Sequence, residues 1–245
     1  MRVLLRKTSL VDYPGKVAAA LFFPGCTLRC PWCQNRELVI PGGMAGMTGL
    51  CTAGEALDHI LKRRSVLGGV VVSGGEPTVH ADLGDIIRRI KALGLPVKLD
   101  TNGMNPGALE RLFCREESRP DYIALDLKLP PERYGNLAPQ SAAHSAAPLE
   151  IGEALAKSAA LIHASGIDHE FRSLVLPNHY LKPEEIPAMA ALVDDAPWHF
   201  RAFRPGNCLD PAWDSLDAPG PEETAALARK AREAGKKGIE PERAP

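Results

Sequence analysis

The chain has 245 residues, of which 45% are hydrophobic and 24% are charged. This size and composition are typical of a soluble enzyme with one sizeable core. The formal net charge is -1, so there is no basic field to attract nucleic acid or an anionic membrane. The longest apolar run, Val17 to Phe23, is far too short to cross a bilayer. Charges and a proline make the first sixteen residues a poor secretory signal, so we expect a cytoplasmic enzyme without nucleic acid or membrane partners.

Short apolar runs alternate with helix-like stretches along most of the chain. Apolar runs that are mostly rich in β-branched or aromatic residues predict six strands, at residues 17–23, 69–73, 96–100, 122–127, 170–176 and 198–203. Between them, the spacing of apolar residues predicts helices, at residues 53–64, 81–93, from 106 onward, 151–165 and 183–193. The chain therefore has the pattern of repeated β/α units.

This pattern predicts an α/β fold. Strands that are almost wholly apolar and alternate with helices indicate a parallel sheet that is covered on both faces. Six such units fit either a (β/α) barrel or a doubly wound sheet. In barrels, the loops at the carboxyl ends of the strands build the active site. Polar motifs follow four of the predicted strands: the cysteine loop at 26–33, Gly-Gly-Glu-Pro at 74–77, Asp-Thr-Asn-Gly at 100–103 and Asp-Leu-Lys at 126–128. We therefore predict a partial (β/α)6 barrel with one site at that face.

Two segments do not fit the repeated units. Residues 135–148 contain few large apolar side chains and predict a flexible surface loop. Residues 222–234 form a charged, alanine-rich helical stretch, and the chain after them predicts a frayed tail. The sequence therefore predicts a barrel domain over residues 1–216 and a C-terminal helix with a tail over residues 217–245.

Three of the six cysteines, Cys26, Cys30 and Cys33, lie within eight residues. Three thiolates at C-x3-C-x2-C spacing after a strand can converge on one metal centre. A structural zinc site normally has four ligands, and a disulfide is typical of small secreted chains. The number of ligands therefore favours an iron–sulfur cluster with one open iron over zinc or a disulfide. The other cysteines are Cys51, Cys114 and Cys208, which fit ordinary small residues, although Cys208 lies in a Gly/Pro loop near the expected site.

The sequence CTLRCPWC at 26–33 resembles the CxxxCxxC signature of the radical S-adenosylmethionine (SAM) superfamily, including an aromatic residue, Trp32, before the last cysteine. The sequence GGEP at 74–77 resembles a second motif of that superfamily, at the end of the second strand. Two such motifs at matching strand ends argue against a chance agreement. The resemblance implies a [4Fe–4S] cluster bound by Cys26, Cys30 and Cys33, with the methionyl group of SAM on the fourth iron.

More narrowly, the chain resembles the glycyl-radical-enzyme activating proteins, in particular the type that activates anaerobic ribonucleoside-triphosphate reductase. The likeness covers about residues 5 to 210. It rests on short motifs: DYPGK at 12–16, FPGC at 23–26, CQN at 33–35, KLDTNG at 98–103, DLK at 126–128 and FRPGNC at 203–208. The chain has no cysteine-rich insert for further clusters, so the resemblance implies a compact form with a single cluster.

The resemblance also implies a reaction and its partners. The cluster would accept one electron and pass it to SAM, which yields methionine and a 5′-deoxyadenosyl radical, while the protein orients the reactants and excludes quenching reactions. A backbone glycine of a partner protein would then become a glycyl radical. The expected partner is a glycyl radical enzyme, most of all the large subunit of anaerobic ribonucleotide reductase. Flavodoxin or ferredoxin would serve as the electron donor.

By the same resemblance, residues at the first two strand ends would bind the cofactor. These are Trp32, Gly74, Gly75 and Glu76, with the loop carbonyls and Glu76 receiving the methionyl ammonium of SAM. The two glycines have no Cβ, so their backbone can approach a ligand closely. The alternative is a tight strand-to-helix turn that is closed by Pro77.

Two further pairs of residues follow the third and fourth strands. The resemblance implies that Asp100 meets the SAM amine or ribose and that Asn102 meets a neighbouring polar group, whereas Asn-Gly is also a strong turn signal. Asp126 and Lys128 alternate on a strand and point to the same face. By resemblance they would hold the SAM amine and carboxylate; the alternative is a salt bridge at a strand end. A buried charge is costly unless it is paired or faces a polar cavity, which favours a functional pair.

Other roles and functions stay open at this point. Arg172 and Arg204 could each bind a carboxylate in the barrel interior or form an exposed ion pair. The chain could be a radical SAM enzyme that acts on a small molecule, similar to 7-carboxy-7-deazaguanine synthase. An interaction module that binds iron–sulfur or zinc is a third class, and it would hold metal without cleaving SAM.

Overall fold

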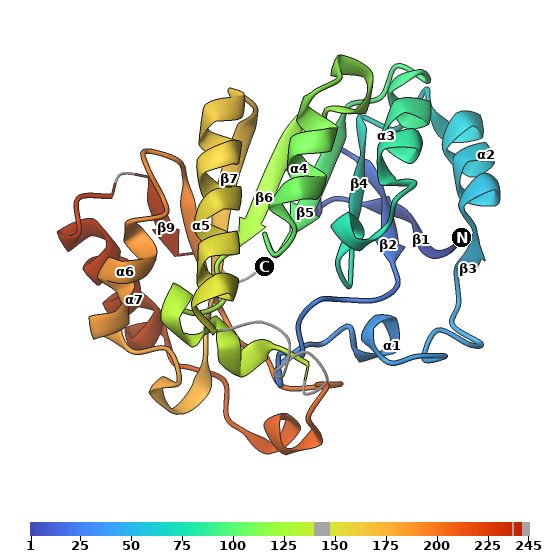
Figure 1. Cartoon of the computed structure of the whole chain (residues 1–245). Coiled ribbons are helices and arrows are strands. Elements are labelled where there is room, and N and C mark those ends of the chain that lie inside the picture. The colour runs from blue at the N-terminus through green and yellow to red at the C-terminus, as the bar shows by residue number, and fades with distance from the viewer. Residues whose placement is uncertain (140–147, 237, 242–245) are drawn as a thin grey trace. The chain divides into compact units, whose positions relative to one another are not determined.

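The structure is a computed structural model that describes residues 1–139, 148–236 and 238–241 (Figure 1). The contacts between Cα atoms divide the chain into two compact units. The first contains Met1–Thr27, Asn35–Thr101 and Asn105–Ile123, and the second contains Leu28–Gln34, Asn102–Met104 and the chain from Ala124 on. No described helix is both long enough and apolar enough to span a membrane.

The first unit is built on five strands in the order β3-β1-β2-β4-β5. Their bounds are β1 (Arg2–Ser9), β2 (Ala18–Phe23), β3 (Leu50–Thr52), β4 (Gly69–Gly74) and β5 (Val97–Thr101). The predicted parallel pairing is confirmed for β2 with β4 and for β4 with β5. The N-terminal β1 differs, because it runs antiparallel to both β2 and β3. In β1, Val3 and Leu5 are buried and their neighbours are more exposed, which is the alternation of a strand with one face on the core. The sequence pattern did not predict this strand.

Helices connect the strands of the first unit (Figure 1). Their bounds are α1 (Arg36–Val39), α2 (Ala53–Arg63), α3 (Leu83–Lys91) and α4 (Pro106–Phe113). The α3 sequence explains its position, because Leu83, Ile86, Ile87 and Ile90 repeat at helical spacing and are all buried. The start of α4 is set by Pro106 and by Asn105, whose side chain accepts a hydrogen bond from the amide of Ala108.

The second unit contains most of β6 and three further strands in the order β6-β7-β8-β9. The strands are β6 (Tyr122–Asp126), β7 (Asp168–Val175), β8 (Trp198–Ala202) and β9 (Ile239–Pro241), and the helices are α5 (Pro148–Ser165), α6 (Ile186–Ala190) and α7 (Pro221–Glu233). β7, β8 and β9 pair in parallel. Phe171, Trp198 and Phe200 are fully buried and form the centre of this core.

All six predicted strands are present, with ends that shift by no more than two residues. The tail after α7 was predicted to be frayed, but part of it forms β9, which pairs with β8 through Ile239 and Trp198. The segment expected as a flexible surface loop at 135–148 also differs at its start, where Leu137 is fully buried. Its residues 140–147 lie outside the described residues. The proposed division at residue 217 stays a prediction.

The N-terminus of α2 gives a test of this local structure. Thr52 Oγ1 accepts a hydrogen bond from the Glu55 amide at 3.2 Å, and the Thr52 amide donates to Glu55 Oε2 at 2.8 Å. Thr52→Ala removes the hydroxyl of this capping box and should lower the free energy of unfolding by about 1 kcal/mol in urea denaturation. Thr52→Ser keeps the hydroxyl and should retain most of that stability. An equal loss in both variants would contradict the cap.

Candidate functional site

The loop after β4, which we call the GGE loop (Gly74, Gly75 and Glu76), is tied to the loop after β2. The amide of Gly75 donates to Phe23 O at 2.9 Å, and the amide of Glu76 donates to Gly25 O at 2.8 Å. A Cβ at residue 74 would lie 2.2 Å from Phe23 N, and a Cβ at residue 75 would lie 1.9 Å from Gly25 O. Gly74 also has a φ of +129°, which other residues rarely adopt. Both positions therefore require glycine, and the loop is fixed to the residue that precedes the first clustered cysteine.

The Glu76 side chain lies in the interior of the first unit, with only 1% of the residue exposed. Its Oε1 accepts hydrogen bonds from Thr78 N at 3.1 Å, Thr78 Oγ1 at 2.6 Å and Thr101 Oγ1 at 2.8 Å. The first contact caps the short 3-10 helix that begins at Pro77. The turn interpretation thus accounts for part of the GGE motif. The carboxylate has a second oxygen, so these contacts are compatible with cofactor binding by the same residue.

A buried ion pair lies on β5, next to the GGE loop in the first unit. Lys98 Nζ donates to Asp100 Oδ1 at 2.5 Å, and the side chains of Lys98 and Asp100 are 1% and 14% exposed. Residues two apart on a strand point to the same face, which is the signal that could have predicted this pair. The sequence interpretation assigned a role to Asp100 but none to its lysine partner.

The three clustered cysteines are divided between the units. Cys26 belongs to the first unit, and Cys30 and Cys33 belong to the second. None of the three is in a disulfide, and the amide of Cys33 donates to Cys30 O at 3.0 Å in a tight turn. Within the described residues, no group of three or more His, Cys, Asp or Glu side chains is already gathered around a metal position. The donor chemistry of three thiols nevertheless fits an iron–sulfur cluster, so their role as ligands stays a prediction.

Trp32 packs into an aromatic group of the second unit. Its ring centroid lies 5.5 Å from that of Tyr180 and 5.2 Å from that of Trp213, and the residue is 3% exposed. The cysteine turn is held at a second point, where the amide of Leu209 donates to Cys33 O at 2.9 Å. Trp32 therefore anchors the turn, and its contact with a cofactor stays a prediction.

Asn102 forms the turn that the Asn-Gly sequence predicts. Its Oδ1 accepts a hydrogen bond from the amide of Met104 at 3.0 Å, and Gly103 has a φ of +76°. Ser158 Oγ holds the turn from α5 by donating to Gly103 O at 2.6 Å. The turn interpretation of Asn102 is confirmed, and its proposed contact with a polar group of the cofactor stays a prediction.

Asp126, Lys128 and Arg172 form a charged trio in the second unit. Asp126 Oδ1 accepts from Arg172 Nε at 2.8 Å, and Asp126 Oδ2 accepts from Lys128 Nζ at 3.3 Å. Lys128 lies just beyond the end of β6, not within the strand as predicted. Its salt bridge with Asp126 is the alternative interpretation of this pair, and the contact of both residues with SAM stays a prediction. Arg172 binds the carboxylate of Asp126; the sequence alone left the partner of this arginine open.

The charges of this trio set the ionisation of Asp126. Burial acts to raise the pKa of its carboxyl, but the nearby charges of Arg172 and Lys128 and the hydrogen bonds from both outweigh burial and lower the pKa to about 2. Asp126 is therefore ionised at neutral pH. The trio then has one net positive charge, since two cations share a single carboxylate.

Tyr134 is a residue that sequence reasoning missed. It is fully buried, its hydroxyl accepts a hydrogen bond from the amide of Lys128 at 2.9 Å, and it donates to Asp126 O at 3.3 Å. Burial raises the pKa of the Tyr134 phenol well above its usual range, so the hydroxyl stays neutral. Tyr134 thus fixes the backbone between Asp126 and Lys128 from one side.

The loop after β8 contains the other two residues that were left open. Cys208 is fully buried. This burial is the largest cause that raises the pKa of its thiol, and the neighbouring Asp214 raises it further, to about 11. The amides of Gly206 and Cys208 both donate to Asp214 Oδ1, at 3.1 and 2.9 Å. Cys208 is therefore a protonated core residue, as expected of the scattered cysteines. Arg204 is exposed, and its carbonyl accepts a hydrogen bond from Gln34 Nε2.

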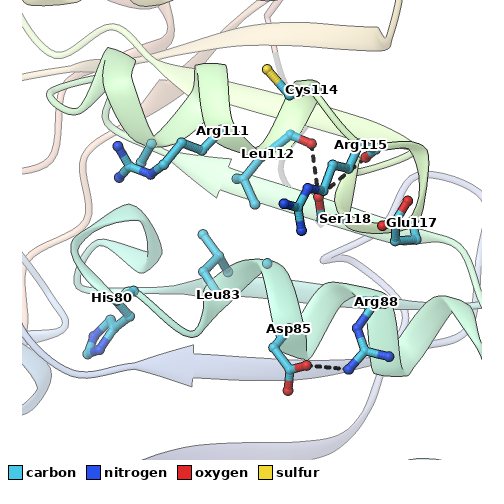
Figure 2. Close-up of a pocket in the computed structure, with 13 residues that line it drawn as sticks. His80, Leu83, Asp85, Arg88, Arg111, Leu112, Cys114, Arg115, Glu117 and Ser118 are labelled. Carbon is cyan, nitrogen blue, oxygen red and sulfur yellow. Dashed lines mark hydrogen bonds and ion pairs between the residues drawn. The ribbon is translucent and has the colours of Figure 1, made fainter.

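A pocket of about 510 Å³ lies elsewhere in the first unit, between α3 and α4 (Figure 2). Asp85 and Arg88 form an ion pair on its α3 side, and Leu83 and Leu112 contribute apolar surface. None of the residues that were predicted to hold a cluster or SAM lines this pocket. It is therefore separate from the strand-end residues described above.

Comparisons with known proteins bear on the family. A family model of the radical SAM superfamily matches residues 21–193. A protein of Methanocaldococcus jannaschii, provisionally named glycyl-radical enzyme activating enzyme MJ1227, is 29% identical over 228 residues, which are 91% of this chain and 88% of that protein. The pyruvate formate-lyase-activating enzyme of Clostridium pasteurianum is 34% identical over 129 residues, 51% of this chain and 50% of its own length.

A solved structure bears on the fold. A radical SAM methyltransferase from Sphaerobacter thermophilus aligns with a TM-score of 0.66 and 20% sequence identity, over 95% of this chain and 68% of that chain. At this identity the likeness concerns the fold alone. Together with the family match, it confirms the predicted class, an α/β chain of the radical SAM type with a partial barrel.

The close approach of the GGE loop to Gly25 gives a prediction about stability. Gly75→Ala places a Cβ where Gly25 O already lies, and such overpacking should lower the free energy of unfolding by about 1–3 kcal/mol in urea denaturation of the metal-free protein. Gly54→Ala in α2 is the matched control, because the nearest atom to its Cβ is Thr52 Oγ1 at 3.9 Å. Equal stability of the two variants would show that the approach is looser than described.

The charged trio predicts a dependence of stability on pH. The pKa of Asp126 is about 2 in the folded chain and about 3.9 in an unfolded chain. Its ion pairs therefore stabilise the fold above about pH 4, and this contribution disappears as the pH falls through about 2. Asp126→Asn should be less stable than the wild type at about pH 5, and the difference should shrink at about pH 2.5, as measured by chemical denaturation. A difference that does not change with pH contradicts this assignment.

Proposed function

We propose that this chain, which belongs to the radical SAM superfamily, is an activating enzyme that generates a glycyl radical on a partner enzyme. One observation carries the proposal: a relative that is named as an activating enzyme of this kind aligns with 91% of this chain, at 29% identity. A second relative, whose alignment with this chain covers half of its own length, is named for the activation of pyruvate formate-lyase. The compact cysteine pattern, without an insert for further clusters, agrees with this function.

The cofactors of the superfamily are a [4Fe–4S] cluster and SAM. Cys26, Cys30 and Cys33 would bind the cluster, since they have the spacing of the superfamily motif and none of them is in a disulfide. When bound, the cluster supplies the electron for the reductive cleavage of SAM to methionine and a 5′-deoxyadenosyl radical. Trp32 and the hydrogen bond to Cys33 O hold the cysteine turn in place for this role.

The residues of the first unit would receive the amine end of SAM. Gly74 and Gly75 leave no side chain between the loop backbone and a ligand, and Glu76 is held by hydrogen bonds to Thr78 and Thr101. Asp100 would add a second carboxylate for the cationic amine. Two carboxylates near one ammonium favour its charged form, so this set suits the amine rather than the carboxylate of SAM.

The residues of the second unit would receive a negative group. Lys128 and Arg172 both bind the carboxylate of Asp126, and their cationic groups would attract the carboxylate of SAM. Tyr134 fixes the backbone amide of Lys128, so that the lysine starts from a defined position. Asn102 would contact SAM only through groups that its turn to Met104 does not use.

The partner that we favour is the large subunit of anaerobic ribonucleoside-triphosphate reductase. The motifs KLDTNG at 98–103 and FRPGNC at 203–208 support this choice through their resemblance to that type of activating protein. Pyruvate formate-lyase is the next candidate, because of the name of the shorter match. Flavodoxin or ferredoxin would donate the electron.

The test is electron paramagnetic resonance (EPR) of the reconstituted protein with each candidate partner, under anaerobic conditions with SAM and a low-potential reductant. We expect a glycyl-radical doublet with the ribonucleotide reductase subunit. Cys30→Ala should abolish the doublet because it removes a cluster ligand. Cys114→Ala is the matched control, since Cys114 is exposed and lies outside the cysteine cluster, and it should leave the doublet unchanged.

The outcomes separate the candidate functions. A doublet only with pyruvate formate-lyase would keep the activating function and change the partner. Cleavage of SAM without a protein radical, together with turnover of a purine precursor, would identify a small-molecule enzyme of the 7-carboxy-7-deazaguanine synthase type. Bound zinc without iron and without SAM cleavage would identify a metal-binding interaction module.

A further inference from the structure

Lys98 is a buried cation in the middle of a parallel strand. Only 1% of its side chain is exposed, and it is aligned with Val71 of β4 in the sheet. Val71 belongs to an apolar cluster with Tyr13, Ala18 and Ala20. A lysine in such surroundings loses most of its hydration, and this cost is large unless a counter-charge replaces the water.

Asp100 supplies that counter-charge. Lys98 Nζ lies 2.5 Å from Asp100 Oδ1, and the ring centroid of Tyr122 lies 6.0 Å from the same ammonium. Because Lys98 and Asp100 are two residues apart on β5, both side chains project from the same face. Asp100 itself is 14% exposed, so this pair runs from the apolar interior to the edge where the polar motif begins.

This geometry restricts the Asp100 carboxylate. The hydrogen bond fixes Oδ1, and the fixed strand backbone fixes Cα, so the remaining freedom of the side chain is small. Because an aspartate held in this way is already ordered, it loses little conformational freedom when it accepts a hydrogen bond from a ligand.

We propose that Lys98 is a positioning residue for SAM: it holds the carboxylate of Asp100 in the orientation that receives the amine of SAM. The proposal rests on the proposed function, because Asp100 is there assigned to the cofactor. Lys98 does not contact SAM in this account and acts only through Asp100. The same lysine also partly neutralises the carboxylate, which by itself would weaken the attraction for an ammonium. The positioning effect must therefore exceed this electrostatic loss.

A double-mutant cycle on SAM binding tests the proposal. The dissociation constant of SAM is measured by isothermal titration calorimetry on the anaerobically reconstituted protein, for wild type, Lys98→Met, Asp100→Asn and the double variant. We expect each single variant to weaken binding by about 10-fold, because Asp100→Asn removes the charged acceptor for the amine and Lys98→Met removes the contact that orients this acceptor. In the Asp100→Asn background, Lys98→Met should weaken SAM binding by much less, since the two residues act as one unit.

Two further variants serve as controls. Lys91 also pairs with an aspartate, Asp121, at 3.2 Å in the same unit, but it lies at the end of α3 and outside the strand-end motifs. Lys91→Met should leave the dissociation constant of SAM unchanged. Lys98→Arg keeps the positive charge and should restore part of the affinity. If the thermal midpoint shows that Lys98→Met is poorly folded, the Lys98→Arg variant takes its place in the cycle.

The outcomes distinguish this inference from the proposed function. If the wild type binds SAM and Asp100→Asn weakens the binding, but Lys98→Met binds as the wild type does or more tightly, the positioning role is wrong and the proposed function stands. The same holds if Lys98→Met causes an equal loss with and without Asp100, which indicates a general effect on the fold. If a wild type with its cluster does not bind SAM, the proposed function fails, and the role of Lys98 fails with it.

Discussion

The close approach of Gly75 to the carbonyl of Gly25 is the constraint on which the first unit depends at its functional end. A Cβ at residue 75 would lie 1.9 Å from that oxygen, so the two loops meet backbone to backbone. Two hydrogen bonds, to Phe23 O and to Gly25 O, hold them together. The residue after Gly25 is Cys26, and the residue after Gly75 is Glu76. The position of the first clustered cysteine and the position of a buried carboxylate are thereby set by one contact.

Paired charges follow the same principle in both units. Asp100 and Asp126 lie near the carboxyl ends of β5 and β6, and each is bound by cations: Asp100 by Lys98, and Asp126 by Lys128 and Arg172. Burying an unpaired charge is costly, so the buried Lys98 in particular requires its partner. The first unit thus holds a lysine–aspartate pair, and the second holds one aspartate bound by two cations.

Apolar strand patterns made the architecture predictable, whereas the partners of the charged residues were not. VAAALFF and GVVVS predicted strands because only a buried parallel strand tolerates such continuous apolar runs. β1 was missed because its period-two pattern is interrupted by charges, and β9 because three residues have no readable period. Asn102 was identified as part of a turn from Asn-Gly alone. Arg172 and Tyr134 reach Asp126 and Lys128 from other segments of the chain, and no local pattern indicates such contacts.

The central claim is that the three clustered cysteines make this chain a SAM-cleaving enzyme. The most direct measurement is the amount of 5′-deoxyadenosine and methionine formed from SAM by the anaerobically reconstituted protein with a low-potential reductant, without any partner. The account predicts that both products form in equal amounts and that Cys33→Ala forms neither. Unchanged cleavage by Cys33→Ala, or no cleavage by a wild type that holds a full cluster, would contradict it.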